Sequence, residues 1–291
     1  MDILKVLLLS FVEGITEFLP ISSTGHLILF NEFVQLEPAH FANAFNIIIQ
    51  LGAILSVVVV FFHKLNPFDR SRTARALPAR YDEWNTQTRF YYRLTHYDRS
   101  TMQLWGKVIV GVLPAVVLGL LFDDFIDAHL MNAPVVIAML LIYGVVILQL
   151  EGRNAGRKTF RFPTADDLTY RTAFLIGLFQ CLAMVPGTSR SAATIIGAML
   201  LGASRVAAAE FSFYLAIPTM LGATFLKVLK NLGGFSMGQW LLILLGFVVS
   251  FLVAYVVIQK FLQFIHRHDF RIFGYYRIAL ALVVGLYYLF F

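Results

Sequence analysis

Cysteine and charge are both scarce in this chain of 291 residues. One cysteine, Cys181, is too few for a disulfide-rich secreted protein. Charged residues make up 14% of the sequence, against about 25% in a typical soluble domain. Hydrophobic residues reach 59%, which excludes a disordered chain and leaves too little polar surface for a soluble fold. The basic excess lies in loops between apolar runs, so it indicates membrane topology rather than nucleic-acid binding. The composition predicts a polytopic membrane protein.

Six apolar runs approach the length of about 20 residues that crosses a bilayer as a helix. They are about Phe41–His63, Leu104–Phe122, Ala133–Leu150, Val206–Leu229, Trp240–Lys260 and Ile272–Phe291. Two further apolar segments, about 3–34 and 172–201, are broken by polar residues. Their apolar stretches are too short to span, so each predicts a re-entrant hairpin with its polar centre buried in protein. Two ordinary loops between short helices are the alternative.

The two broken segments resemble each other. A proline, Pro20 or Pro186, stands at each polar centre, and the next span carries Leu-Gly-Ala at Leu51–Ala53 or Leu221–Ala223. Each half is then one hairpin plus three spans, and an odd number of spans inverts the second half. We predict an all-α polytopic membrane protein, a single domain over 1–291. It would be an inverted-topology repeat (1–150 and 165–291) of six transmembrane helices plus two re-entrant helix-loop-helix hairpins, with a site where the repeats meet.

Lys and Arg are concentrated in the loops that this topology assigns to one face. These loops are 64–103, 151–171, 202–205 and 261–271, and nine of the basic residues lie in Lys64–Lys107. The positive-inside rule makes this face cytoplasmic and puts both termini outside. The long basic loop 64–103 is either an interfacial helix on anionic lipid headgroups or a solvated loop.

Glu13 and Glu17 are four residues apart in the first broken segment, so on a helix they share a face. Carboxylates inside an apolar segment are costly unless they are paired, protonated or bound to a cation. The pair predicts a divalent cation site, such as Mg²⁺ shared with phosphate oxygens, or a general base. Capping of a nearby backbone break is the structural alternative.

The polar run Ser22-Ser23-Thr24-Gly25-His26 directly follows the helix-breaking Pro20 and Ile21. Its hydroxyls can cap the next helix, and the amides at that new N-terminus favour an anion. One hydroxyl could also act as a nucleophile, with His26 or Glu17 as its base. Capping alone for the hydroxyls, and a core position for the histidine, are the simpler alternatives.

The second polar centre is Pro186-Gly187-Thr188-Ser189-Arg190-Ser191-Ala192-Ala193-Thr194. Arg190 is a fixed positive charge inside an apolar segment, and its guanidinium matches phosphate geometry. Gly187 permits a tight turn, and the neighbouring hydroxyls add donors. A structural ion pair of Arg190 with Glu13 or Glu17 is the alternative, and it is compatible with phosphate binding if the pair opens. Together the two centres predict an anionic substrate clamped between the repeats, which suits phosphoryl transfer.

These two motifs resemble a known family. Glu13–His26 closely resembles the first signature of the undecaprenyl-diphosphatase family, also called bacitracin-resistance proteins, and Pro186–Thr194 resembles its second, PGxSRSxxT. Length, hydropathy and the Leu-Gly-Ala spans extend the resemblance over the whole chain. It implies a bacterial inner-membrane enzyme that hydrolyses undecaprenyl diphosphate to undecaprenyl phosphate and inorganic phosphate. This recycles the lipid carrier for peptidoglycan synthesis and confers bacitracin resistance.

The resemblance also implies site residues, a cofactor and partners. It assigns catalysis to Glu13, Glu17, Ser23, His26 and Arg190. It assigns phosphate contacts to Ser22, Thr24, Gly187, Ser189, Ser191 and Thr194. A divalent cation (Mg²⁺ or Ca²⁺) is expected on Glu13 and Glu17, a polyprenyl diphosphate lipid as substrate, membrane lipid around the chain, and a homodimer. The nucleophile stays open between Ser23, His26 and an activated water.

A secondary transporter or lipid flippase for an anionic substrate is the main alternative function. Inverted repeats with broken helices and charges at the midplane are typical of transporters. The dense cluster of serine, histidine and paired glutamates opposite an arginine is more than an ion-coupled carrier requires. This cluster favours the hydrolase.

Overall fold

The computed structural model describes residues 2–23, 25–27, 30, 34–69, 81–95, 97–157, 159–231 and 235–290. Its regular structure is helical, and these residues contain no β-strand beyond one isolated bridge between Phe162 and Ala203. The α-helices are α1 (Asp2–Thr16), α3 (Ala39–Val60), α4 (Phe62–Leu65), α5 (Thr86–Thr95), α6 (Arg99–His129), α7 (Ala133–Arg153), α8 (Tyr170–Cys181), α9 (Arg190–Leu200), α10 (Arg205–Asn231), α11 (Met237–Ile265) and α12 (Arg271–Phe290). Short 3₁₀ helices are η1 (Tyr81–Glu83), η2 (Ala165–Asp167) and η3 (Leu182–Met184). The all-α prediction is confirmed.

Five helices in the described part of the chain are long and apolar enough to cross a membrane. They are His40–Val60, Arg99–Phe122, Ala133–Arg153, Met237–Ile265 and Arg271–Phe290, and they coincide with five of the predicted spans. The sixth predicted span, Val206–Leu229, is helical within α10 but is not one of these five. The N-terminal half of α10 is surrounded by protein, with Ala207–Ala209 and Phe211–Ala216 buried, so it needs less apolar surface. Its crossing of the membrane stays a prediction.

α1, α8 and α9 are each shorter than a membrane span. α8 and α9 are joined by the turn at Pro186, and we call this pair the second hairpin. The first hairpin consists of α1, a turn over 17–22, and a second arm in which Ser23, Gly25–Leu27 and Phe30 are helical. Thr24 lies outside the described residues. Both predicted breaks are therefore turns, and each follows a short helix.

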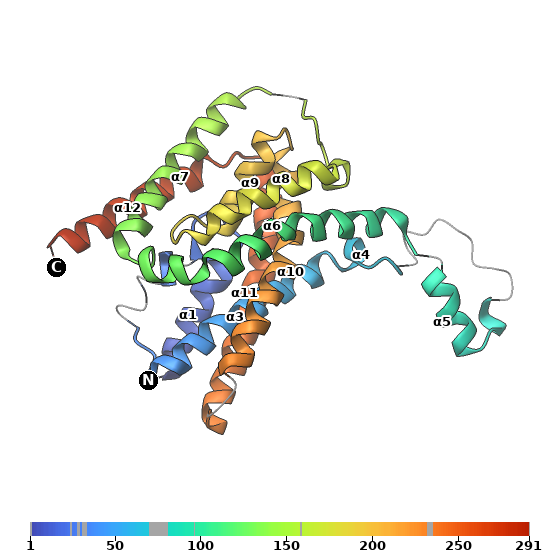
Figure 1. Ribbon diagram of the computed structural model, residues 1–291, viewed down its shortest axis with the longest axis horizontal. Helices are drawn as coiled ribbons and strands as arrows, with labels where there is room; N and C mark the ends of the chain where they lie inside the picture. The colour runs from blue at the N-terminus through green and yellow to red at the C-terminus, as the bar shows by residue number, and fades with distance from the viewer. Residues whose placement is uncertain are drawn as a thin grey trace.

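Helices from the two halves of the chain pack against each other (Figure 1). α1 lies along α11, α8 lies along α6, α3 contacts both α10 and α11, and α7 lies along α12. Close approach needs glycine, because a Cβ on Gly52 would collide with the Phe247 carbonyl and a Cβ on Gly177 with the Gly111 carbonyl. The first arm of each hairpin is thus held by a long helix of the other half.

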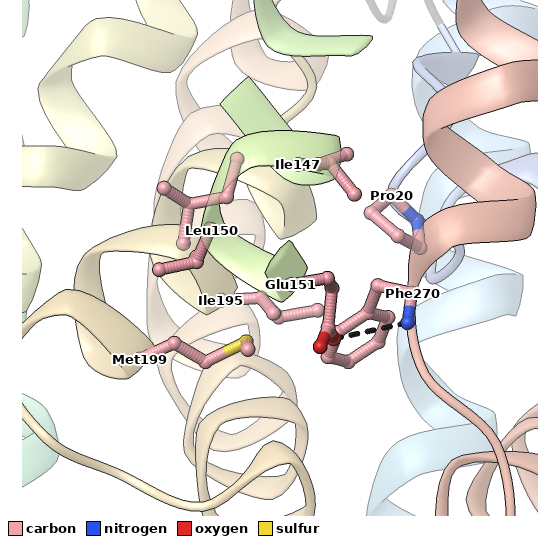
Figure 2. A pocket seen from close by; sticks show the side chains of 8 residues that line it. Pro20, Ile147, Leu150, Glu151, Ile195, Met199 and Phe270 are labelled. Atoms are coloured by element: carbon pink, nitrogen blue, oxygen red, sulfur yellow. Dashed lines mark hydrogen bonds between the residues drawn. The ribbon is translucent and has the colours of Figure 1, made fainter. Parts of the chain in front are cut away.

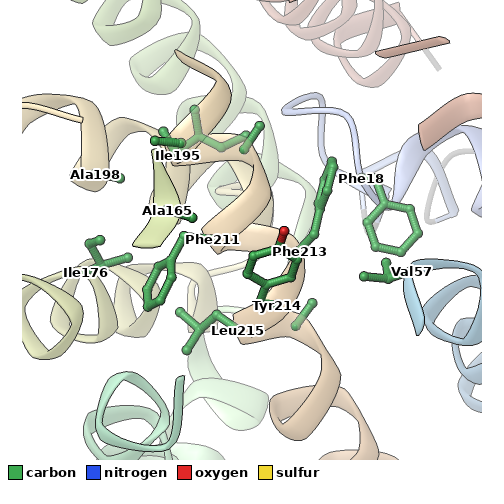
Figure 3. Close-up of a cluster of buried hydrophobic side chains, with 14 of the residues drawn as sticks. Phe18, Val57, Ala165, Ile176, Ile195, Ala198, Phe211, Phe213, Tyr214 and Leu215 are labelled. Atoms are coloured by element: carbon green, nitrogen blue, oxygen red, sulfur yellow. The ribbon is translucent and has the colours of Figure 1, made fainter. Parts of the chain in front are cut away.

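The main hydrophobic cluster anchors the first turn (Figure 3). Phe18, which directly follows Glu17, is fully buried and meets Phe213 of α10 edge to face at 5.3 Å. Phe61 and Tyr214 make a second edge-to-face contact at 5.1 Å. Such aromatic pairs add about 0.5–1.5 kcal/mol beyond the burial of their area. Packing of Phe18 therefore limits where the carboxylate beside it can lie.

Ion pairs join the loops that the charge pattern assigns to one face. The Glu151 carboxylate accepts a hydrogen bond from Arg205 Nε at 2.9 Å. It also accepts from the Phe270 backbone N–H at 3.0 Å (Figure 2). Lys64 Nζ lies 3.1 Å from Glu210 and 3.5 Å from Asp166. Glu210, which no motif explained, is thereby a packing contact between α4 and α10. These contacts link residues in or next to all four loops.

The segment 64–103 is more ordered than a loop. It includes the end of α4, η1, α5 and the start of α6, while 70–80 and His96 lie outside the described residues. α6 begins at Arg99 because the Asp98 side chain caps it, five residues before the predicted span. Phe90 and Tyr91 of α5 are exposed, 60% and 72%, as an interfacial helix requires. Its contact with lipid stays a prediction.

Candidate active site

A serine in the left-handed region begins the second arm of the first hairpin. Ser22 has φ 74°, which is uncommon for a residue with a side chain. Its Oγ accepts from the Gly25 N–H at 3.2 Å, and its carbonyl accepts from the His26 N–H at 3.2 Å. The Ser22 side chain is therefore a helix cap.

The second hairpin repeats this turn. Ser189 has φ 73°, its Oγ accepts from the Ala192 N–H at 3.3 Å, and its carbonyl accepts from the Ala193 N–H at 3.0 Å. Gly187 has φ +88° and abuts Val136, whose backbone a Cβ would strike. Ser22 and Ser189 are thus structural equivalents, although Ser189 lies one residue further from its proline.

Glu17 joins the two turns. Ser23 Oγ donates to Glu17 Oε2 at 2.7 Å, and Arg190 Nη2 donates to Glu17 Oε1 at 3.3 Å. Ser23 and Arg190 each directly follow the cap serine of their own hairpin. The equivalent positions of the two hairpins therefore bind opposite oxygens of one buried carboxylate, and Arg190 also donates to the Ser212 carbonyl at 3.0 Å.

Glu13 lies one turn before Glu17 and is fully buried. Within the described part of the chain neither of its carboxyl oxygens has a hydrogen-bond donor, and its neighbour is another acid, Glu17. A buried carboxylate without a donor is costly unless a proton or a cation neutralises it. The carboxylates of Glu13 and Glu17 offer oxygen ligands that suit a divalent cation, which would complete its coordination with water and phosphate oxygens. No group of three or more His, Cys, Asp or Glu side chains able to hold a metal lies among the described residues.

A pocket of about 180 Å³ opens beside Glu17. Its polar lining includes Ser23, Ser189 and Arg190. The other lining residues are Gln50, Ala183, Pro186, Gly187 and Met220. The pocket brings a hydroxyl, a carboxylate and a guanidinium to one space, which is suited to a phosphate group.

His26 lies away from this pocket. Its Nδ1 is 2.7 Å from the Ser22 carbonyl, and its Nε2 is 2.6 Å from the Tyr276 hydroxyl. A carbonyl only accepts, so Nδ1 carries the proton and, in the neutral ring, Nε2 accepts from Tyr276. The two rings are nearly parallel with centroids 5.6 Å apart. Both nitrogens of the predicted catalytic histidine are engaged with groups other than Ser23.

The other predicted phosphate contacts are mostly buried. Ser191 donates to the Leu19 carbonyl at 2.9 Å, which ties the second hairpin to the first turn. Thr194 donates to the Arg190 carbonyl at 2.9 Å and is 2.6 Å from Ser212 Oγ. Of the described candidates, Ser189 and Gly187 line the pocket, whereas Ser22, Ser191 and Thr194 contact protein instead. Their phosphate contacts stay predictions.

Arg277 is a buried residue that the motif search missed. Its Nη1 donates to the Pro20 carbonyl at 3.2 Å, and its Nη2 donates to the Gly187 carbonyl at 2.7 Å and the Met139 carbonyl at 3.2 Å. It is fully buried, and its guanidinium lies 5.6 Å from the centre of the Tyr143 ring. A charge inside the last predicted span was the available signal, because such a charge needs a partner. Arg277 holds both turns together.

Comparison with known proteins gives one consistent result. A family model described as "Bacitracin resistance protein BacA" matches residues 6–283. The chain is 47% identical to undecaprenyl-diphosphatase 1 of Clostridioides difficile over 289 residues, 99% of this chain and 97% of that protein. It is 50% identical to the undecaprenyl-diphosphatase of Fusobacterium nucleatum over 287 residues, 96% and 98% of the two chains. The chain belongs to the bacitracin resistance protein BacA family.

Proposed function

We propose that this multi-pass membrane protein hydrolyses undecaprenyl diphosphate to undecaprenyl phosphate and inorganic phosphate. Relatives that align with this chain over nearly their full length are named for this reaction. The observation that carries the proposal at the site is the convergence of Ser23 and Arg190 on the two oxygens of Glu17, beside a pocket. The reaction returns the lipid carrier to peptidoglycan synthesis, and excess enzyme confers bacitracin resistance.

In the proposed reaction, Arg190 binds oxygens of the terminal phosphate and Ser23 Oγ attacks its phosphorus. The Ser23 proton passes to Glu17, 2.7 Å away, while the anhydride bond breaks and undecaprenyl phosphate leaves. Water then hydrolyses the phosphoserine and releases inorganic phosphate. The contacts of Ser23 favour Glu17 over His26 as the proton acceptor, and His26 then supports the first turn. Attack by His26 or by water directly are the competing routes.

Glu13 and Glu17 are the residues that would hold a divalent cation, Mg²⁺ or Ca²⁺. When bound, the cation would neutralise charge on the phosphate oxygens. The two carboxyl oxygens of Glu13, which lack a donor in the described structure, support this proposal.

The proposed architecture is the inverted repeat of 1–150 and 165–291, with α10 as the sixth span and both hairpins re-entrant. A two-fold relation between the halves pairs α1 with α8, α3 with α10, α6 with α11 and α7 with α12. The packing of α1 on α11 then corresponds to that of α8 on α6, which supports the relation. We further propose that the chain lies in the bacterial inner membrane with both termini outside, and that it forms a homodimer as the family resemblance implies.

The decisive experiment is phosphate release from undecaprenyl diphosphate by the purified protein in detergent. Release by the native chain, with a phosphorylated peptide containing Ser23 trapped during turnover, is the expected result. Phosphate on His26 would overturn the Ser23 route, and no trapped intermediate in a fast-quench series would favour direct attack by water. No phosphate release by the folded native chain would overturn the hydrolase and favour a carrier.

A further inference from the structure

Gln50 of α3 and Met220 of α10 line the pocket, and both lie far in the sequence from the two motifs. Each directly precedes a Leu-Gly-Ala triplet, Leu51–Ala53 in the first half and Leu221–Ala223 in the second. The same position of the repeated pattern therefore reaches the same pocket from both halves. This parallels Ser23 and Arg190, which occupy equivalent positions of the two hairpins and meet at Glu17.

The two equivalent residues differ in chemistry. Gln50 is half-buried, and no described group forms a hydrogen bond with its amide, which offers two N–H donors and one acceptor. Met220 is only 8% exposed and belongs to the main hydrophobic cluster. One wall residue is thus polar and available to a ligand, and the other is apolar and packed.

The pocket has fewer donors for an anion than its residues suggest. Arg190 already gives one N–H to Glu17 and one to the Ser212 carbonyl, and the Ser23 hydroxyl donates to Glu17. Glu17 itself repels a phosphate group. A neutral amide adds donors without adding charge, whereas a lysine would compete with Arg190 for Glu17 and a carboxylate would add repulsion. Gln50 therefore supplies neutral N–H donors in addition to those that Arg190 does not give to Glu17 or Ser212.

We propose that Gln50 is a substrate-binding residue that donates its amide N–H groups to a phosphoryl oxygen of the diphosphate. Met220 forms the apolar wall against the first isoprene unit of the prenyl chain. The proposal rests on the proposed function for the identity of the lipid. It divides the pocket into a headgroup side contributed by α3 and a chain side contributed by α10.

The test measures inorganic pyrophosphate binding to purified protein by calorimetry, together with KM and kcat for undecaprenyl diphosphate. Gln50→Leu keeps approximately the side-chain size but removes the N–H donors. We expect the Kd for pyrophosphate to rise about tenfold or more, and the KM for the lipid to rise by a similar factor. Met220→Ala should raise KM for the lipid and leave pyrophosphate binding unchanged. Gln149→Leu, on the exposed part of α7, is the matched control and should change neither value.

The outcomes are separable. Unchanged pyrophosphate binding in Gln50→Leu overturns the proposal, as does a native protein that binds no pyrophosphate. A lower kcat of Gln50→Leu with unchanged pyrophosphate binding also overturns the proposal. Gln50 would then orient water instead of binding the substrate. Because binding is measured without turnover, a native chain that binds pyrophosphate through Gln50 but releases no phosphate contradicts the proposed function alone. Partial recovery of binding in Gln50→Asn distinguishes donation from mere packing.

Discussion

The two hairpin turns have the same backbone design and opposite chemistry. Each begins its second arm with a serine at positive φ whose hydroxyl caps that arm, Ser22 in the first and Ser189 in the second. The next residue is a hydroxyl in one hairpin, Ser23, and a cation in the other, Arg190. Both contact Glu17 of the first hairpin. The comparison teaches that neither hairpin holds a site alone, and that repetition of one turn places complementary groups face to face.

The two turns also differ in how they are held. The first is anchored by Phe18 in the core, and the second by the close approach of Gly187 to Val136. Arg277 then binds a carbonyl of each turn. The distance between Ser23 (the hydroxyl side of the site) and Arg190 (the cation side) therefore depends on a residue from outside both hairpins.

The largest effect is expected from the hydroxyl side. Ser23→Ala should lower phosphate release on the order of 10³-fold or more, because the nucleophile is lost. Ser22→Ala, the adjacent cap, should mainly lower the melting temperature, so it is the matched control. Retention of a tenth of native activity in Ser23→Ala would exclude Ser23 as the nucleophile and leave His26 or water.

The cation side comes next. Arg190→Ala should reduce kcat/KM by about 100- to 1000-fold, since it removes the charge that faces the phosphate. Arg190→Lys should recover only part of this loss because it lacks the planar fork. Equal activity of the lysine and native proteins would show that position 190 supplies charge without specific geometry.

The third prediction breaks the link between the turns. Arg277→Met should destabilise the protein by about 3 kcal/mol or more, because three carbonyl groups lose a charged donor. We expect a lower melting temperature in detergent together with loss of phosphate release. Arg271→Met, at the exposed start of α12, is the control. A native melting temperature in Arg277→Met would contradict the clamp.

The smallest effect is expected at the histidine. Tyr276→Phe removes the hydrogen bond to His26 Nε2 and should lower activity by about three- to tenfold. The pH profile of kcat/KM should shift if His26 titrates in the reaction and stay unchanged if it only supports the turn. The decisive comparison repeats Tyr276→Phe in a protein that also carries His26→Gln. If the pH profile of kcat/KM shifts only when His26 is present, His26 transfers the proton.

Much of the fold could be predicted because it follows from local patterns. Apolar run length predicts the spans, and proline followed by hydroxyls predicts each break and, in the first hairpin, the capping hydroxyl. α10 is harder to recognise as a span from its composition, because a helix surrounded by protein tolerates polar residues such as Glu210 and Ser212. The long segment at 64–103 contains α5, which the weak periodicity of a basic, aromatic stretch left open.

The site could be predicted only in part. Glu13, Glu17 and Arg190 were recognisable because charge inside an apolar segment needs a partner. Arg277 carried the same signal inside the last span and was missed because no motif surrounds it. Gln50 and Tyr276 give no such signal, because placing a neutral amide or phenol in a half-buried position costs little free energy.

The membrane class, the two broken segments, their internal likeness and the family all follow from the amino-acid sequence alone. These depend on composition and short-range order, which are properties of neighbouring residues. The folded arrangement is needed to see that one oxygen of Glu17 accepts from Ser23 and the other from Arg190, 173 residues away. It also decided that His26 turns to Tyr276, 250 residues away, and not to the pocket. Such pairings arise when short helices of each half pack against long helices of the other, a choice that local sequence does not contain.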